Sequence, residues 1–375
     1  MKRLSLLLFL LAALSIESLA CTSAVVAPQR SSEGVPLLWK HRDNGKFTNT
    51  RIEYISDGRY AYTAVVPNSE KYDKGVYAGI NEKGLGVIST ATKNLPEATP
   101  EEYKACTLSR MSGGVMWNAL RKCATIDELE ELLKKTKRSR RSHSNFGVGD
   151  ASGAVAYFEV WDLGYRRYDV STSGNDGFDV RSNFSHAGDP RKIGSSKRRY
   201  DLIMKEMKEM TEYKGNFTPQ NFIDYSRSYN SIKYGNVLDN EAKYYCSNHT
   251  VPRASTVGVF VVVCDGKSPR MLVMNGHSVS SIAVPVYVQA GSNIPECVHG
   301  DAMRLLSNDF REKAYTTINK KKLLNKELIR SVLRIKQPKI EMPKETPVDI
   351  YAFNANIDKL FAKHEKRVRK VLNKF

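Results

Sequence analysis

Cys21 follows a segment that is typical of an export signal. Two basic residues precede an apolar run at residues 4–14, and Ser18 and Ala20 are the small residues that a signal peptidase inspects. Cleavage after Ala20 would leave 375 − 20 = 355 residues, with Cys21 at their amino terminus. Such a cysteine would combine a nucleophilic thiol and a basic α-amine in one residue.

The chemistry open to a terminal Cys21 is attack on an amide carbonyl. The thiol attacks as a thiolate, and the α-amine, whose reference pKa is about 8, can take the thiol proton without help from a histidine. The tetrahedral intermediate needs hydrogen-bond donors placed in advance around its oxygen. The α-ammonium also needs an acidic partner, which Asp43 on a second predicted strand could supply.

Two other interpretations of Cys21 are open at this point. The cysteine could be lipidated, although a lipoprotein signal prefers an aliphatic residue three places before the cysteine and a small one two places before. Here those places hold Ser18 and Leu19, the reverse order. Cys21 could also be half of a disulfide. The motif alone therefore leaves a nucleophile, a lipid anchor and a disulfide as alternatives.

The cysteine and histidine spacings give no sign of a metal or a cofactor. Apart from Cys21 the sequence has five cysteines: Cys106, Cys123, Cys246, Cys264 and Cys297. Five cysteines can form at most two disulfide bridges and leave one free thiol. None of the spacings is CxxC and no histidine clusters with them, which argues against a structural zinc site. The sequence also lacks GxSxG, HExxH, a Walker loop and a GxGxxG that opens a helix. We predict no cofactor and no metal.

The chain is strongly basic, with a formal net charge of +18. Such a charge can indicate a nucleic-acid or acidic-surface partner. The basic residues are spread along the chain and form no zinc-finger, homeodomain or RNP signature, so we interpret them as solvated surface and predict no nucleic-acid partner. No stretch after the leader is long and apolar enough to cross a bilayer. We therefore predict a secreted or periplasmic protein that meets a membrane only if Cys21 is lipidated.

Predicted helices and strands occur in blocks, which favours an α+β fold with antiparallel sheets over a doubly wound one. A capping box at Thr125 and Glu128 begins one predicted helix, and Thr218 with Pro219 begins another. After Asp301 the character changes. A basic helix is expected to begin at residues 320–322, and a last helix has apolar residues at helical spacing. That face must pack on the domain or on a second copy in a homo-oligomer.

Three stretches, in order, resemble the cysteine N-terminal nucleophile hydrolases. More closely, they are similar to the group of penicillin V acylase, choloylglycine (bile salt) hydrolase and isopenicillin-N acyltransferase. The first stretch is Cys-Thr-Ser-Ala at 21–24 with Trp-Lys-His-Arg-Asp at 39–43. The second, at 79–87, looks like the GxNExGLxV segment of that group. The third is Asp-Ala-Ser-Gly at 150–153 followed by Val-Arg-Ser-Asn at 180–183. The likeness runs from Cys21 to Val288.

The resemblance implies an αββα sandwich of two antiparallel sheets with outer helices. It also implies roles for four residues. Cys21 would be the nucleophile and supply the base, Asp43 would orient the α-amine, and Asn183 would donate its side-chain amide to the oxyanion. Arg253 would hold charge near the thiol, although Ser255 or Thr256 could fill the same place. The alternatives are a loop asparagine that satisfies local backbone and a surface arginine.

Two positions depart from the pattern of the group. Many relatives carry an arginine three residues before the aspartate, where this sequence has Lys40. Because arginine and lysine differ in bidentate contacts, recognition of a substrate carboxylate there is in doubt. In bile salt hydrolases an asparagine follows the GLxV strand as a second oxyanion donor, whereas the matching place here is near Ala91. A backbone N–H could serve instead, so bile salts are not an assured substrate.

These observations predict three parts: a signal peptide at 1–20, an N-terminal nucleophile hydrolase domain at 21–300, and a basic helical extension at 301–375. The expected function is an exported cysteine amidohydrolase. It would cleave a linear, non-peptide C–N bond in a small-molecule N-acyl amide through an acyl-thioester on Cys21. The alternatives are an acyltransferase of the isopenicillin-N type and a lipid-anchored, non-catalytic surface protein.

Overall fold

The structure is a computed structural model. It describes residues 20–45, 50–68, 75–99, 101–102, 112–136, 142–171, 174, 176–213, 215–239, 249–318 and 321–375. The predicted signal peptide therefore lies outside the described residues except for its last residue, Ala20.

The first of two large antiparallel sheets includes Asp43 and is adjoined by Cys21 and Asn183, three of the predicted site residues. In spatial order its strands are β10 (Phe178–Arg181), β1 (Thr22–Val26), β2 (Leu37–Asp43), β13 (Thr256–Val263), β14 (Arg270–Met274) and β15 (Val284–Tyr287). Every residue of β1, β2 and β13 is buried. Because the sheet is covered on both faces, β13 is a nearly continuous run of β-branched residues in place of strict alternation. The second half of β2 instead carries the buried polar residues 40–43.

The second sheet is a meander in which each strand pairs with the next in sequence. Its strands are β3 (Thr50–Ile55), β4 (Tyr62–Pro67), β5 (Ala78–Asn81), β6 (Gly86–Ala91), β7 (Ser144–Gly149), β8 (Val155–Trp161) and β9 (Gly164–Asp169). A hydrophobic cluster between the two sheets includes Val25 and Leu38 from the first and Ile88 and Tyr157 from the second.

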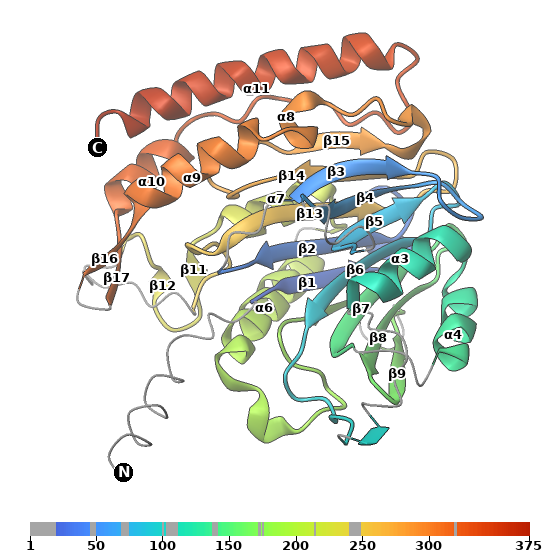
Figure 1. The fold of residues 1–375 in the computed structure, drawn as a ribbon. Coiled ribbons are helices and arrows are strands. Elements are labelled where there is room, and N and C mark those ends of the chain that lie inside the picture. Colours follow the sequence, from blue (N-terminus) through green and yellow to red (C-terminus); the bar gives the residue numbers. More distant parts are fainter. Residues whose placement is uncertain are drawn as a thin grey trace, which may run out of the picture.

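Helices cover both outer faces of the paired sheets (Figure 1). On the first sheet lie α6 (Lys197–Tyr213) and α7 (Pro219–Arg227), whose apolar residues join those of β1, β2 and β13 in one cluster. On the second sheet lie α3 (Ser112–Lys122) and α4 (Ile126–Lys135). The predicted α+β class and αββα sandwich are confirmed.

Two predicted helix starts are confirmed by their capping contacts. The Thr125 side chain accepts a hydrogen bond from the Glu128 backbone at the start of α4. At α7, Thr218 and Asn221 form a reciprocal capping box, with Pro219 in the first turn. Each cap satisfies backbone N–H groups that a helix terminus leaves without partners.

The remaining elements are short or belong to the last quarter of the chain. The short ones are β11 (Asn230–Ser231), β12 (Gly235–Asn236) and the 3₁₀ turns η1 (Pro28–Arg30), η3 (Pro190–Lys192), η4 (Gly194–Ser196) and η5 (Val288–Ala290). The late ones are α8 (Glu296–His299), α9 (Ala302–Ala314), β16 (Tyr315–Ile318), β17 (Lys321–Leu324), α10 (Lys326–Leu333) and α11 (Ile350–Leu372).

The expectation of a basic helix beginning at residues 320–322 is wrong, because Lys321 and Lys322 lie in β17. They pair with β16, whose Tyr-Thr-Thr-Ile run favours strand, so hairpin pairing overrides the helix propensity of the lysines. The predicted last helix is present as α11. Its apolar residues Ile357 and Phe361 belong to the same hydrophobic cluster as Val25 of β1, so this helix packs on the rest of the chain.

Within the described residues, no helix combines the length and the apolar composition needed to cross a membrane.

Candidate functional site

Cys21 lies at the start of β1, between two neighbouring strands. Strand β1 pairs antiparallel with β2 and with β10. If these registers are extended beyond the amino-terminal end of β1, Cys21 lies opposite Arg42 on one side and opposite Asn183 on the other. Two residues along, Ser23 points to the second sheet, where its hydroxyl is 2.8 Å from that of Tyr157. By the alternation of a strand, the Cys21 side chain points between the sheets, and only 6% of the residue is exposed.

Asp43 ends β2 and is fully buried among cationic and hydroxyl groups. Its Oδ2 forms an ion pair with Arg253 Nε at 3.1 Å, and its Oδ1 accepts a hydrogen bond from the Thr256 hydroxyl at 2.9 Å. His41 Nε2 is 3.4 Å from the same Oδ1. Burial alone would raise the pKa of Asp43, but the Arg253 charge and the His41 contact outweigh it and hold that pKa below the usual value.

Arg253, the cation that the sequence analysis predicts near the thiol, is buried against Asp43. Thr256, the alternative for the same place, lies there as well. Its hydroxyl accepts a hydrogen bond from the Arg253 backbone N–H at 3.0 Å, so the two residues hold Asp43 together. Among the described residues, Asp43 Oδ2 accepts no hydrogen bond, which leaves it an open acceptor position beside the Arg253 charge.

Arg199, on α6, connects the nucleophile to the expected oxyanion donor. One of its guanidinium nitrogens, Nη1, donates to the Cys21 carbonyl oxygen at 2.6 Å and to the Thr22 hydroxyl at 2.6 Å. The other, Nη2, donates to Asn183 Oδ1 at 2.9 Å. Burial and the neighbouring Arg253 lower the pKa of Arg199, while Asp43 and Cys21 oppose them. The Arg199 guanidinium therefore interacts with all four predicted site residues, through hydrogen bonds to Cys21 and Asn183 and electrostatically with Asp43 and Arg253.

Sequence reasoning missed Arg199 as a site residue, although a signal was present. Arg199 begins the apolar stripe of α6, in line with Leu202, Ile203 and Met207 at helical spacing. An arginine on the buried face of an amphipathic helix must find acceptors inside the protein. Only the fold shows that these acceptors are the backbone of Cys21 and the side chain of Asn183.

The Asn183 side chain is fixed at both ends of its amide. Its Nδ2 donates to the Ala91 carbonyl oxygen at 2.8 Å, while its Oδ1 accepts from Arg199. Because a side-chain amide has two N–H donors, one remains for a further acceptor. Ala91, near the place where the sequence resemblance locates a second oxyanion donor, supplies a carbonyl that orients Asn183.

Two cations of β2 lie on the face that Cys21 shares. The buried Lys40 ammonium donates to the Tyr77 carbonyl oxygen at 2.7 Å, and the Arg42 guanidinium stacks 3.9 Å from the centre of the Tyr77 ring. Burial lowers the pKa of Lys40 to about 8, with Cys21 acting to raise it and Arg42 to lower it further. A lysine that interacts with the Cys21 thiol therefore changes its charge near neutral pH.

The four described cysteines are free thiols: Cys21, Cys123, Cys264 and Cys297. Cys106 and Cys246, the remaining two of the six, lie outside the described residues. Within the described part of the chain, no three side chains among histidine, cysteine, aspartate and glutamate are grouped so as to hold a metal ion.

No model of a known protein family matches this sequence, and neither does any curated protein. Solved structures with a similar fold include an N-acylethanolamine-hydrolyzing acid amidase ortholog from Caenorhabditis elegans. It is 18% identical with a TM-score of 0.39, and the match covers 65% of this chain and 93% of that one.

Two further similar structures belong to the group that the sequence motifs resemble. A variant of conjugated bile acid hydrolase from Clostridium perfringens is 9% identical with a TM-score of 0.43, over 71% of this chain and 92% of that one. Penicillin V acylase from Agrobacterium tumefaciens is 13% identical with a TM-score of 0.42, over 72% and 86%. At these identities and TM-scores, the function has to be inferred from the site itself.

Proposed function

We propose that this protein is an exported cysteine amidohydrolase whose nucleophile is Cys21, exposed as a free amino terminus by cleavage after Ala20. One observation carries the proposal. The Arg199 guanidinium bonds the Cys21 backbone and the Asn183 side chain together, beside the buried Asp43–Arg253 pair. A thiol, an amide donor and a buried carboxylate therefore lie together at the amino-terminal end of β1, as amide hydrolysis by a terminal cysteine requires.

In the proposed reaction the α-amine takes the thiol proton, and the Cys21 sulfur attacks the amide carbon. Asn183 Nδ2 donates to the oxyanion of the tetrahedral intermediate. The α-ammonium then gives its proton to the leaving nitrogen, so the C–N bond breaks and a thioester remains on Cys21. Water, deprotonated by the same amine, adds to the thioester, and the carboxylic acid leaves as the thiol reforms.

Asp43 would hold the α-ammonium through this cycle. The register of β1 with β2 places residue 20 opposite Asp43, so the nitrogen of Cys21 lies close to the end of β2. The ion pair with Arg253 keeps the Asp43 carboxylate anionic, and Oδ2 has room to accept a further hydrogen bond. The burial of Cys21 between the sheets also favours a free thiol over a diacylglyceryl anchor, which would need to reach a bilayer.

The direct test is mass spectrometry of the mature protein before and after brief exposure to N-acyl amides. We expect a chain that begins with an unmodified Cys21 and gains the mass of the acyl group during turnover. The substrate panel should contain bile salts, phenoxyacyl lactams and N-acyl amino acids. A lipidated Cys21, or turnover without any acyl adduct on it, would contradict the proposal. Acyl transfer to an added amine would identify an acyltransferase instead.

An alanine inserted between Ala20 and Cys21 tests the α-amine as the base. The mature chain would then begin with the extra alanine, so the amine and the thiol would lie on different residues. We expect the rate of acylation to fall by about 10² to 10⁴, the usual contribution of a positioned base. Amino-terminal mass spectrometry must show that the extra residue is present. Full activity of a chain that carries it would show that the amine is not needed.

Lys40 should set an alkaline limit on activity. The ammonium stabilises a nearby thiolate below its pKa of about 8, and this support is lost as pH rises through that value. We therefore expect kcat/KM to fall on the alkaline side of about pH 8. In Lys40→Arg the cation persists at higher pH, so the fall should move upward. A pH profile that is identical in the two proteins would exclude Lys40 as its cause.

A further inference from the structure

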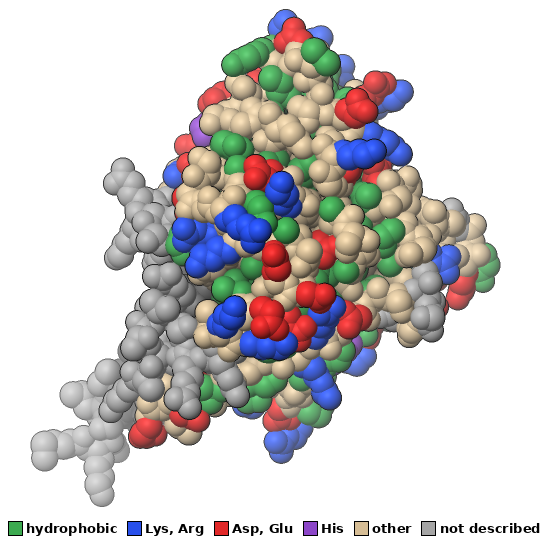
Figure 2. Space-filling view, turned by 90° about the vertical axis from the view of Figure 1, so that its right-hand side faces the viewer, with side chains coloured by type: hydrophobic (Ala, Val, Ile, Leu, Met, Phe, Trp, Pro, Cys, Tyr) green, Lys and Arg blue, Asp and Glu red, His purple; other side chains and the backbone are tan. Residues whose placement is uncertain are grey.

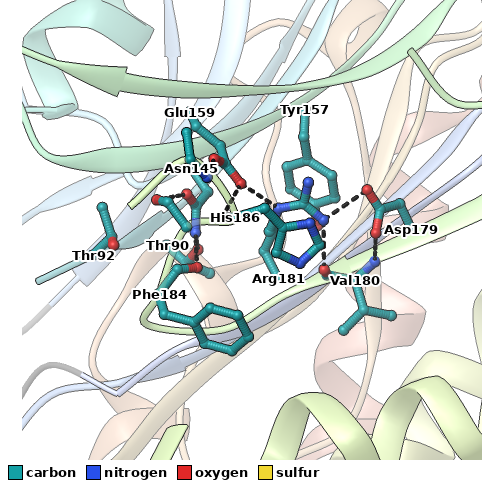
Figure 3. Close-up of polar contacts among 12 residues, drawn as sticks. Thr90, Thr92, Asn145, Tyr157, Glu159, Asp179, Val180, Arg181, Phe184 and His186 are labelled. Carbon is teal, nitrogen blue, oxygen red and sulfur yellow. Dashed lines mark hydrogen bonds and ion pairs between the residues drawn. The ribbon is translucent and has the colours of Figure 1, made fainter. Parts of the chain in front are cut away.

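The segment that carries Asn183 is fixed by side chains from the second sheet. Asn145 of β7 is fully buried, and its Nδ2 donates to the carbonyl oxygens of Ser182 at 3.1 Å and Phe184 at 2.9 Å. These carbonyls flank Asn183 on both sides. The Asn145 Oδ1 accepts from the Ser185 hydroxyl, so the amide can take only one orientation (Figure 3).

A second contact fixes the far end of the same segment. Glu159 of β8 is fully buried and accepts hydrogen bonds from the backbone N–H groups of His186 at 2.8 Å and Ala187 at 2.7 Å. Arg181, just before the segment, neutralises this carboxylate through an Nε–Oε1 contact of 2.9 Å (Figure 3). Residues 182–187 are thus held from β7 and β8 mainly through their backbone, with the Ser185 hydroxyl as a further side-chain contact.

We infer that Asn145 is the positioning residue of the oxyanion donor, an inference that rests on the proposed function. Donors to an oxyanion stabilise a transition state only when they are fixed before the reaction, and small displacements are costly. Asn145 sets the backbone on both sides of Asn183, while Ala91 and Arg199 set its side chain. Asn145 itself touches neither Cys21 nor Asn183 in the described contacts.

Asn81 offers a matched control for the Asn145→Ala variant. It is also fully buried, and its Nδ2 also donates to two backbone carbonyls, those of Leu120 at 2.9 Å and Cys123 at 2.7 Å. Both alanine variants lose the same kind of clamp, but only one clamp holds the Asn183 segment. We expect Asn145→Ala to lower kcat by roughly tenfold or more with KM unchanged, and Asn81→Ala to leave kcat within about twofold of wild type.

The decisive measurement repeats both substitutions in an Asn183→Ala background. If Asn145 acts through Asn183, its loss should cost nothing further there, because the donor that it positions is gone. Full additivity, or equal losses of kcat in the Asn145 and Asn81 variants of an active enzyme, would overturn the inference alone. Absence of acyl-Cys21 in the wild-type protein would overturn the proposed function and this inference with it.

If Asn145→Ala does not fold, Thr90→Val can be used in its place. This variant removes the hydroxyl that donates to the Ser182 carbonyl oxygen at 3.1 Å.

An independent observation concerns the solvent face of α11. Five exposed cations lie on this helix without an exposed acidic residue: Lys359, Lys363, Lys366, Arg367 and Lys370. At 100° per residue they fall within an arc of about 100° and extend over about 17 Å. The two acidic residues of the helix are engaged elsewhere, Asp358 with the start of α8 and Glu365 with Arg369.

The charge pattern of this cationic stripe differs from that of the face shown in Figure 2, where positive and negative side chains are interspersed. Elsewhere on the chain exposed cations pair with acidic residues, as Arg167 does with Asp127 and Glu130. The helix α11 runs along the outer edge of the molecule (Figure 1). A straight stripe on an outer edge can bring all of its charges to a flat anionic surface at once.

We propose that α11 is the contact of this protein with anionic lipid surfaces, independent of any lipid on Cys21. Exposed apolar side chains bracket the stripe, with Tyr351 71% exposed before it and Phe375 44% exposed after it. Cations flanked by aromatic residues suit the boundary between lipid headgroups and water better than a polymer in solution. The opposite face of α11 is buried, so the helix would adsorb by charge without inserting.

Sedimentation with phosphatidylcholine vesicles, with and without phosphatidylserine, tests this contact. We expect binding only to the anionic vesicles, and its loss at high salt. The variant Lys363→Glu/Lys366→Glu/Lys370→Glu, which reverses three charges, should bind more weakly by about a hundredfold or more. A control with the same change of charge outside α11, Lys83→Glu/Lys192→Glu/Lys208→Glu, should retain most binding. An equal loss of vesicle binding in both variants would show that net charge alone determines binding. Binding to a soluble polyanion but not to vesicles would identify the ligand as a polymer and not a lipid surface. Either outcome overturns the proposal.

Discussion

Replacement of Cys21 by alanine is expected to abolish amide hydrolysis while leaving the fold intact. The thiol is the only group proposed to bond to the substrate, and no other described cysteine lies in the site. The smaller alanine side chain fits the buried position at the amino-terminal end of β1. Turnover should fall to background, and the acyl adduct should disappear from the mass spectrum. The circular dichroism spectrum and melting temperature should remain close to those of the wild-type protein.

Cys123→Ala is the matched control for this prediction. Cys123 is also a buried free thiol, 3% exposed, but it lies just after α3 on the far side of the second sheet. Its loss should leave kcat unchanged. Cys21→Ser should retain only slow turnover, since a hydroxyl is harder to deprotonate than a thiol. Undiminished hydrolysis by Cys21→Ala would refute the mechanism.

Asn183→Ala is expected to cost about 3 kcal/mol of transition-state stabilisation, by analogy with the removal of other oxyanion donors. That energy corresponds to a fall of about 10² in kcat. The side chain meets the substrate oxygen only after it becomes negative, so KM should change little. Steady-state kinetics on the best substrate of the panel would measure both constants.

The partner contacts of Asn183 complicate this variant in a way that can be controlled. Its loss also leaves the Arg199 guanidinium with one acceptor fewer. Asn183→Asp keeps that acceptor but removes the N–H donor, so it should be as slow as Asn183→Ala. A loss below tenfold in both variants would mean that another group stabilises the oxyanion.

The sequence predicted most of what local patterns determine. The β-branched runs at residues 22–26 and 256–264 correspond to β1 and β13, and the capping residues at Thr125 and Thr218 begin helices as expected. The order of motifs also predicted the two-sheet architecture. The strands and caps depend on neighbouring residues or on hydrophobic periodicity, both of which are visible in one sequence, whereas the two-sheet architecture was implied by the family resemblance.

Contacts between distant residues could not be predicted in the same way. Nothing near Asp43 in the sequence indicates Thr256, which lies 213 residues away and meets it only because β2 pairs with β13. Nor does the sequence indicate that the ring of His41, two residues before Asp43, lies against the same carboxylate. Arg199 could have been suspected from its place on an apolar stripe, but its partners depend on how α6 crosses β1 and β10.

The pairing of β2 with β13 has a consequence for the order of events during synthesis. The ribosome completes β1 and β2 long before β13 exists, and contacts so distant in sequence form slowly. The hydrophobic cluster that contains Val25 also includes Ile357 and Phe361 of α11, so it is complete only after the last helix has been made. The sheet beside Cys21 therefore cannot be assembled before most of the chain has been synthesised. In the proposed exported enzyme, Cys21 would become a competent nucleophile only after the whole chain had crossed the membrane and folded.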